Sequence, residues 1–369
     1  MRIAHVTYHY KPIIGGQEAL TDALVHHLDS FGFEQVIYQS DWGFRGDGVV
    51  VIPKLPRPVR FGALDQYVFQ ARLLASQLTQ LRHSDLLIVH YALYCPLLLW
   101  HPRVIVFSHG RIWDTPTRKL NHKMIKFVSQ RTFQRTGVVA NDTDYLRHMG
   151  LPLSPAARYF EEVAPGKWFV PNCIDIEHFR PTQPLPELAG RDIILVARNL
   201  RYERGIHLAI QAFAHVLKRY QGVVLVIVGT TWAKEYEAFC KRLAHQLAID
   251  KQVVFWGPAS RQLMPAIYSS ALMSLVPSLL TEGTSLSALE GMACGIPTIA
   301  SDVGGLKDLP CLHTPENDAA ALGEKVLLLL QDERKRQELG QRQQAVVRAT
   351  FNFANWKQAW QQVVQKAFQ

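Results

Sequence analysis

Short runs of β-branched and other apolar residues alternate with stretches of helical periodicity along almost the whole chain of 369 residues. Apolar strands separated by helices are typical of parallel sheets that helices cover on both faces. We therefore expect an α/β fold of doubly wound parallel sheets. The strand-like runs are Ile3–Tyr8, Val36–Tyr38, Val49–Ile52, Leu86–Val89, Val104–Phe107, Val138–Ala140, Ile193–Val196, Val223–Val228, Val253–Trp256, Leu272–Val276 and Thr298–Ala300.

The chain is too long for one ordinary core, so two domains are expected. The segment 179–192, FRPTQPLPELAGRD, is dense in Pro and Gly and has no periodic pattern, as expected of a linker. We place an N-terminal Rossmann-like domain at 1–180 and a second one at 181–351. The segment 352–369 carries an apolar helical stripe, and we expect it to pack as a terminal helix on its own domain or back on the first.

The composition narrows the class of protein and of partner. Hydrophobic residues make up 48% and charged residues 19%, which is typical of a globular chain. The net charge of +9 favours an anionic partner, such as a phosphorylated substrate, nucleic acid or an acidic membrane surface. There is no run of about 18 apolar residues and no signal-peptide pattern, and the five cysteines form no C-x-x-C pair. A cytoplasmic protein with reduced cysteines is expected.

Two glutamates stand at a predicted strand–loop–helix junction. Glu282 lies in a Gly/Thr/Ser loop, and Glu290 lies in an apolar run that predicts a helix from about Ser285. Thr284 or Ser285 can cap this helix, and Gly283 lets a ligand approach the backbone. The free amides of the first turn favour a phosphate nearby. The carboxylates would then hold two ends of a polyhydroxyl ligand; the alternative is a capped helix with two solvated glutamates.

Other polar residues stand at strand-to-helix turns. Arg198 follows a predicted strand and Arg204 precedes a helix, and two guanidinium groups suit a diphosphate. A solvated surface is the alternative for this pair. Gly15 and Gly16 occupy the first strand-to-helix turn, where backbone amides could approach a phosphate, although the G-x-G-x-x-G pattern of dinucleotide sites is missing.

Taken together, these motifs resemble those of the family-four retaining glycosyltransferases of the GT-B fold (glycosyltransferase group 1). The resemblance runs nearly from end to end. It is carried by GGQE at 15–18, SHG at 108–110, VPNCID at 170–175, ARNLRYERG at 197–205, VFWG at 254–257, the E-G-x-S-L-S-x-L-E-G-M-A-C-G-x-P pattern from Glu282, and SDVGG at 301–305.

The resemblance implies two Rossmann-like domains with a cleft between them and a C-terminal crossover helix on the first domain. It implies a nucleoside-diphosphate sugar as donor, with no further cofactor and no metal. Glu290 would hold the ribose, Glu282 with the amides of Gly283, Thr284 and Ser285 would hold the sugar, and Arg198 and Arg204 would neutralise the diphosphate. Gly16 would approach that diphosphate, His109 would lie beside the sugar, and the base would lie near Gly257.

The acceptor is the least constrained part. The resemblance places acceptor sites in loops of the first domain, where His9, Lys11 and Arg111 are candidates, and we expect a hydroxyl of a glycan or a lipid-linked sugar. A basic stretch at 117–135 predicts either a solvated helix face or a surface for anionic lipid. Its candidate residues are Lys119, Lys123, Lys126, Arg131 and Arg135.

Two further interpretations are excluded and two are kept as alternatives. The D-x-D at 142–144 opens a predicted helix, so it is read as a helix N-cap and not as a metal site. No recognition helix or aromatic-interleaved basic motif supports nucleic acid. A sugar-nucleotide epimerase and a catalytically inactive relative that serves as a nucleotide-binding or scaffold subunit remain the alternatives to a glycosyltransferase.

Overall fold

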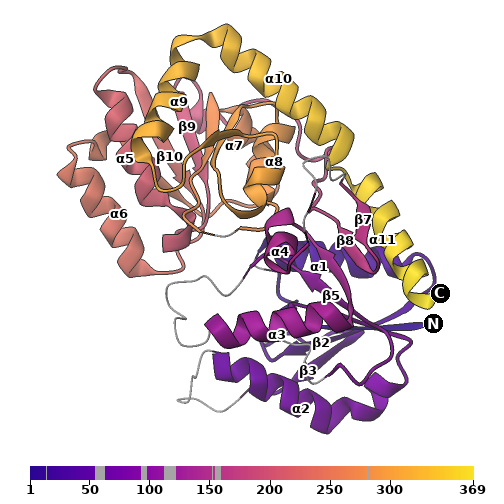
Figure 1. Cartoon of the computed structure of the whole chain (residues 1–369). Coiled ribbons are helices and arrows are strands. Elements are labelled where there is room, and N and C mark those ends of the chain that lie inside the picture. Colours follow the sequence, from indigo (N-terminus) through magenta and orange to yellow (C-terminus); the bar gives the residue numbers. More distant parts are fainter. Residues whose placement is uncertain are drawn as a thin grey trace. The chain divides into compact units, whose positions relative to one another are not determined.

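The computed structural model describes residues 1–13, 15–54, 63–92, 98–111, 122–151, 153, 159–280 and 282–369. The chain forms two compact units, one of Met1–Pro171 with Ala354–Gln369 and one of Asn172–Phe353. Each unit is a parallel sheet with helices on both faces (Figure 1). This confirms the expected α/β class. Among the described residues, no helix combines the length and the hydropathy that a membrane span requires.

The sheet of the first unit has the strand order β3-β2-β1-β4-β5-β6-β8-β7. Every neighbouring pair is parallel except β7 and β8, which are antiparallel. The order reverses direction between β1 and β4, which is the position where doubly wound sheets bind ligands. The strands are β1 (Arg2–Val6), β2 (Glu34–Ser40), β3 (Val49–Ile52), β4 (Leu86–His90), β5 (Val104–Ser108), β6 (Gly137–Ala140), β7 (Glu161–Ala164) and β8 (Lys167–Phe169).

Two layers of helices cover this sheet. Side chains that alternate along the strands, such as Val6 and Val89, form one core with residues of α2 and α3. The opposite face lies under α1 and the C-terminal helix α11, whose Trp360 ring packs edge-on against Phe107 with the ring centroids 4.9 Å apart. The helices are α1 (Gly16–Asp29), α2 (Ala63–Arg82), α3 (His122–Arg135), α4 (Thr143–His148) and α11 (Phe353–Phe368).

The second unit repeats the architecture with the strand order β11-β10-β9-β12-β13-β14, all parallel. Its order reverses between β9 and β12. The strands are β9 (Asp192–Ala197), β10 (Val223–Val228), β11 (Val253–Gly257), β12 (Met273–Val276), β13 (Thr298–Ser301) and β14 (Leu312–Thr314). The helices are α5 (Ile206–Leu217), α6 (Lys234–Gln246), α7 (Met264–Ser269), α8 (Leu286–Ala293), α9 (Ala319–Gln331) and α10 (Glu333–Thr350), with short 3₁₀ helices at Pro186–Leu188, Tyr202–Arg204, Asp250–Gln252 and Gly304–Asp308.

The boundary between the units lies after Pro171, nine residues before the expected position at 180. The intervening residues contact the second unit. The Asn172 side chain donates to the Thr284 carbonyl oxygen at 2.7 Å, and the Ile174 amide donates to the Phe351 carbonyl oxygen at 2.8 Å. Residues before the Pro-rich segment therefore belong to the second unit through their own hydrogen bonds.

Three glycines shape the loops around the end of β9. Gly205 has φ of +69°, and a Cβ there would lie 1.8 Å from the Pro277 carbonyl oxygen. Gly304 has φ of +49°, and its Cβ would lie 2.3 Å from the Glu282 carbonyl oxygen. Gly229 comes similarly close to the Arg198 backbone. These contacts are backbone against backbone, so a side chain cannot be accommodated by a rotamer change.

We predict that Gly205→Ala lowers the stability of the second unit by more than about 2 kcal/mol, because left-handed strain adds to a backbone clash. The control is Gly222→Ala, where φ is +87° and an added Cβ meets no atom within 4 Å. It should cost only about 1 kcal/mol. Calorimetric melting of both variants checks this, and equal losses would contradict the role given to the close approach.

Candidate donor site in the second unit

A cluster of polar side chains lies at the carboxyl ends of β9 and β12, where the strand order of the second sheet reverses. Arg198 follows β9 directly, and Ser278 and Glu282 lie in the segment after β12. The two strands are neighbours in the sheet although their residues are some eighty positions apart in sequence. The topology therefore joins the arginine motif and the first glutamate of the glutamate motif into one site.

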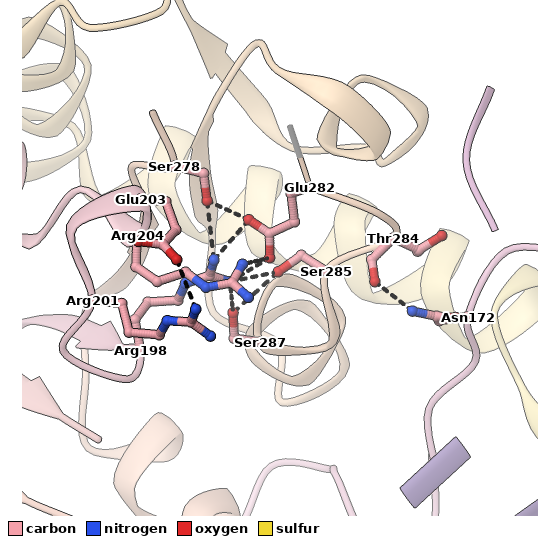
Figure 2. Close-up of polar contacts among 10 residues, drawn as sticks. All are labelled: Asn172, Arg198, Arg201, Glu203, Arg204, Ser278, Glu282, Thr284, Ser285 and Ser287. Carbon is pink, nitrogen blue, oxygen red and sulfur yellow. Dashed lines mark hydrogen bonds and ion pairs between the residues drawn. The ribbon is translucent and has the colours of Figure 1, made fainter. Parts of the chain in front are cut away.

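The Arg198 guanidinium group is the centre of this cluster (Figure 2). Only 7% of the residue is exposed. Its Nη1 donates to Glu282 Oε1 at 2.7 Å and its Nη2 donates to Glu282 Oε2 at 2.7 Å, which is a bidentate ion pair. The same two nitrogens donate to the hydroxyl oxygens of Ser285 at 2.9 Å, Ser287 at 2.8 Å and Ser278 at 3.0 Å. The guanidinium plane is thus fixed by the segment after β12 and by the start of α8.

Glu282 is held as a carboxylate. Burial alone would raise its pKa, but Arg198 and Arg204 together lower it to about 2. Arg204 Nη1 lies 3.0 Å from Glu282 Oε1, and the Ser278 hydroxyl donates to Glu282 Oε2. The side chain is only 9% exposed, so the alternative of a solvated glutamate is wrong for this position. Its carbonyl oxygen accepts from the Gly305 amide at 2.6 Å, which fixes the backbone as well.

Arg204 differs from Arg198 in its exposure. Its side chain is 34% exposed, and among the described residues its one ion pair is the contact with Glu282. An arginine has five N–H donors, so most of its side-chain donors have no partner among the described residues. The two arginines that we expected to share one role therefore differ: Arg198 is part of the framework, while Arg204 can bind an anionic ligand.

Helix α8 begins beside this cluster. Ser285 occupies its N-cap position, but the hydroxyl accepts from Arg198 and makes no capping hydrogen bond to the first turn. The amides of the first turn are therefore not satisfied by their cap residue, and a helix N-terminus of this kind favours an anion. Gly283 is half-buried, and Thr284 and Ser285 are buried.

Glu290 lies on the same helix in a different environment. The Tyr268 hydroxyl group donates to Glu290 Oε2 at 3.0 Å and also lies 3.1 Å from the Ser287 carbonyl oxygen. Burial raises the pKa of Glu290 to about 7, although Tyr268, Arg261 and Arg198 oppose this. The two glutamates therefore carry different charge near neutral pH. Glu282 is a permanent anion, and Glu290 titrates close to neutrality.

The remaining donor candidates lie apart from this cluster in the chain. Gly257 ends β11 with φ of +88°, and a Cβ added there would meet no atom within 4 Å, so the backbone is open to a ligand. Gly16 begins α1 in the first unit, with Gly15 as its N-cap residue. His109 follows β5, also in the first unit, and its Nε2 lies 3.1 Å from His90 Nδ1.

The acceptor candidates lie beside carboxylates inside the first unit. His9 Nδ1 lies 3.1 Å from Glu18, and Lys11 Nζ lies 2.7 Å from Asp22. Arg111 Nε lies 2.6 Å from Asp144, which belongs to the D-x-D motif. The first aspartate of that motif, Asp142, accepts from the Tyr145 amide at 2.6 Å, which confirms the expected helix N-cap. An acceptor role for His9, Lys11 and Arg111 stays a prediction.

The basic stretch is partly described. Lys119 lies outside the described residues. Helix α3 exposes its basic side chains together with Met124, 45% exposed, and Phe127, 58% exposed. Basic and apolar side chains thus share the solvent side of this helix. The exposed basic residues are Lys123, Lys126, Arg131 and Arg135.

The sequence analysis assigned no role to several residues that form the donor site. Ser278 and Ser287 bind Arg198, Tyr268 binds Glu290, and Asn172 holds the Thr284 carbonyl oxygen. The position of Ser278 directly after a strand was a usable signal, because polar residues at strand ends often face the ligand edge. The role of Tyr268 depends on the packing of α7 beside α8, and no local sequence pattern indicates this packing.

Comparisons with known proteins agree with this geometry. Residues 181–346 match the family model described as glycosyl transferases group 1. The GDP-mannose-dependent alpha-(1-6)-phosphatidylinositol monomannoside mannosyltransferase of Mycobacterium tuberculosis is 24% identical over 330 residues, which cover 82% of this chain and 81% of that protein. For two other curated glycosyltransferases the match spans only 29% and 48% of their own length.

Solved structures show the same fold over the whole chain. Sucrose-phosphate synthase from Thermosynechococcus elongatus gives a TM-score of 0.82 at 19% identity, covering 100% of this chain and 99% of that one. HepE of Anabaena, in complex with UDP-glucose, gives a TM-score of 0.75 at 16% identity, covering 99% and 98%. The fold is therefore GT-B, and residues 181–346 match the model of the group 1 glycosyl transferases.

Proposed function

We propose that this chain is a retaining glycosyltransferase that moves a sugar from a nucleoside-diphosphate sugar to a hydroxyl acceptor. The observation that carries the proposal is the convergence of Arg198, Arg204 and Glu282 beside the N-terminus of α8. Open N–H groups of Arg204 and of the first turn of α8 suit a diphosphate, and a buried carboxylate suits sugar hydroxyls.

The chemistry of the donor explains why these groups suit it. Breaking the bond between the sugar and the diphosphate leaves negative charge on the departing oxygen. Positive groups that are already in place stabilise this charge without reorganisation, which is usually the largest electrostatic contribution to such a reaction. We assign this role to Arg204, and we assign to Arg198 the task of holding Glu282 in place for the sugar hydroxyls. Glu290 would accept hydrogen bonds from the ribose hydroxyls.

A direct binding screen can determine the nucleobase and the sugar of the proposed donor. The similar mycobacterial enzyme depends on GDP-mannose, and the similar Anabaena structure holds UDP-glucose. Relatives with this fold therefore differ in base and sugar, and both pairs belong in the first screen. We further propose a glycan or a lipid-linked sugar as acceptor, and an anionic membrane surface as the partner of helix α3, with assembly of a polysaccharide, glycolipid or glycoconjugate as the setting.

The alternatives make different demands. None of the relatives described above is named as an epimerase, and nothing among the described residues of the donor cluster favours epimerisation of a sugar nucleotide. An inactive scaffold would not require the donor cluster to bind a sugar nucleotide.

We predict that one nucleotide among UDP, GDP and ADP, tested with and without a sugar attached, stabilises the second unit by about 2.7 kcal/mol at about 100 times its dissociation constant. Glu290→Ala should weaken this effect because it removes the ribose acceptor. Glu338→Ala, on the exposed face of α10, is the control and should respond like the wild type. Thermal melting measures the effect, and no stabilisation by any nucleotide would favour the scaffold.

We also predict that binding of a nucleoside-diphosphate sugar weakens as the pH falls below 7. The raised pKa of Glu290 means that its carboxyl group becomes protonated in that range and loses acceptor strength. A sugar nucleotide is the right probe because its diphosphate has no ionisation near neutrality. The affinity should fall up to about tenfold per pH unit in the wild type and change little in Glu290→Gln. Equal pH profiles in calorimetric titration would contradict this assignment.

A further inference from the structure

Three histidines cross the sheet of the first unit on the face beneath α1. His5 belongs to β1, His90 belongs to β4 and His109 follows β5, and these strands are neighbours in the order β2-β1-β4-β5. Gln35 of β2 stands at the other end of the series. His5 and His90 are completely buried, and the donor cluster does not use them. We refer to Gln35, His5, His90 and His109 as the histidine row.

Each member of the histidine row lies within hydrogen-bonding distance of the next. Gln35 Oε1 lies 2.9 Å from His5 Nε2, and His5 Nδ1 lies 3.3 Å from His90 Nε2. His90 Nδ1 lies 3.1 Å from His109 Nε2. Every link therefore joins one ring nitrogen to one partner atom, and each inner imidazole uses both of its nitrogens.

The rings are neutral at physiological pH. Burial lowers the pKa of His5 to about 4 and that of His109 to about 3, and it also lowers the pKa of His90 well below its usual value. A neutral imidazole has one N–H donor and one acceptor nitrogen. When all three rings are neutral, every hydrogen bond in the row must run in the same direction.

Gln35 decides which direction this is. Its Nε2 donates to the Phe33 carbonyl oxygen at 3.0 Å, and a carbonyl oxygen can only accept. Gln35 Oε1 must therefore face His5, so His5 donates from Nε2 and accepts at Nδ1. His90 then donates from Nε2, and His109 donates from Nε2 to His90. This leaves the lone pair of His109 on Nδ1.

Neighbouring contacts are compatible with this direction. The Thr21 hydroxyl group lies 3.4 Å from His90 Nδ1 and can donate a weaker hydrogen bond to the same acceptor. The His109 ring is held between aromatic neighbours, with its centroid 4.1 Å from that of Phe107 and 5.4 Å from that of His90. No described residue forms a hydrogen bond with His109 Nδ1, so this atom is available to a ligand at the carboxyl end of β5.

We propose that Gln35, His5 and His90 are positioning residues that fix His109 with its proton on Nε2 and present Nδ1 as an acceptor for a sugar hydroxyl. The proposal rests on the proposed function and on the place beside the donor sugar that the family resemblance gives His109. It specifies the direction of that hydrogen bond, because a hydroxyl group of the sugar must donate to His109 Nδ1. It also assigns a function to residues that otherwise only fill the core.

The proposal is tested first by nitrogen NMR of the full chain labelled with ¹⁵N-histidine. The His109 signals are identified by their loss in His109→Gln. We expect a protonated Nε2 and an unprotonated Nδ1 for His109 in the wild type. In Gln35→Leu the anchor is lost, and we expect a mixture of the two tautomers, whereas Gln35→Glu keeps the acceptor oxygen and should restore the wild-type pattern. A proton on Nδ1 of wild-type His109 would overturn the proposal.

The second readout is the affinity for a nucleoside-diphosphate sugar divided by the affinity for the same nucleotide without sugar. Gln35→Leu should lower this ratio by about three- to tenfold, as expected when one hydrogen bond is weakened. Adding His109→Gln to Gln35→Leu should cause little further loss, because both changes act through one contact. His27→Gln is the control: this buried histidine of α1 donates from Nε2 to the Lys357 carbonyl oxygen, outside the row.

The two readouts separate this proposal from the proposed function. If the wild type binds no nucleotide, the proposed function fails, while the NMR spectrum still decides the tautomer of His109. If nucleotide sugars bind but Gln35→Leu leaves both the tautomer and the affinity ratio unchanged, the proposal is wrong and the proposed function stands. Equal losses of the ratio in Gln35→Leu and His27→Gln would also contradict it, since they would indicate general loosening of the unit.

Discussion

The buried ion pair between Arg198 and Glu282 is the interaction on which the donor site depends. It joins the segments after two neighbouring strands, and its members also bind Ser278, Ser285 and Ser287. Removing two charges from water is costly, and only close geometry with further hydrogen bonds offsets that cost. The pair has both. Its main effect is to fix the loop after β12 and the first turn of α8 before any ligand arrives.

This fixed pair gives the remaining groups distinct properties. Arg204 contacts the same carboxylate from the solvent side and keeps most of its donors for an anion. Glu290 is not a member of the pair, and burial raises its pKa to about 7 because Tyr268, Arg261 and Arg198 offset the burial only in part. One site thus contains a permanent carboxylate and a titrating one. The proposed donor, whose diphosphate lies between two groups that carry hydroxyls, matches that distribution of charge.

The sequence predicts the strands of both sheets closely, because continuous apolar runs and short polar turns are local signals. The β7–β8 hairpin and β14 were missed, although Pro165 and Gly166 mark the turn of the hairpin, since each of these strands is only three or four residues long. Motifs identified Arg198, Arg204, Glu282 and Glu290. Their pairing was not predictable, because it depends on β9 and β12 being neighbours. The same long-range dependence hid Tyr268 and the histidine row, whose members come from separate strands.

The most direct measurement is a double-mutant cycle on Arg198→Met and Glu282→Gln. Thermal melting compares the stability of the wild type, the two single variants and the double variant, with the rest of the donor site unchanged. If the pair organises the site, each single variant leaves a buried polar group without its partner and should lose about 3–5 kcal/mol. The double variant should then lose clearly less than the sum of the two. Additive losses would show that the two residues act independently, and the account of a preformed donor site built on this pair would be wrong.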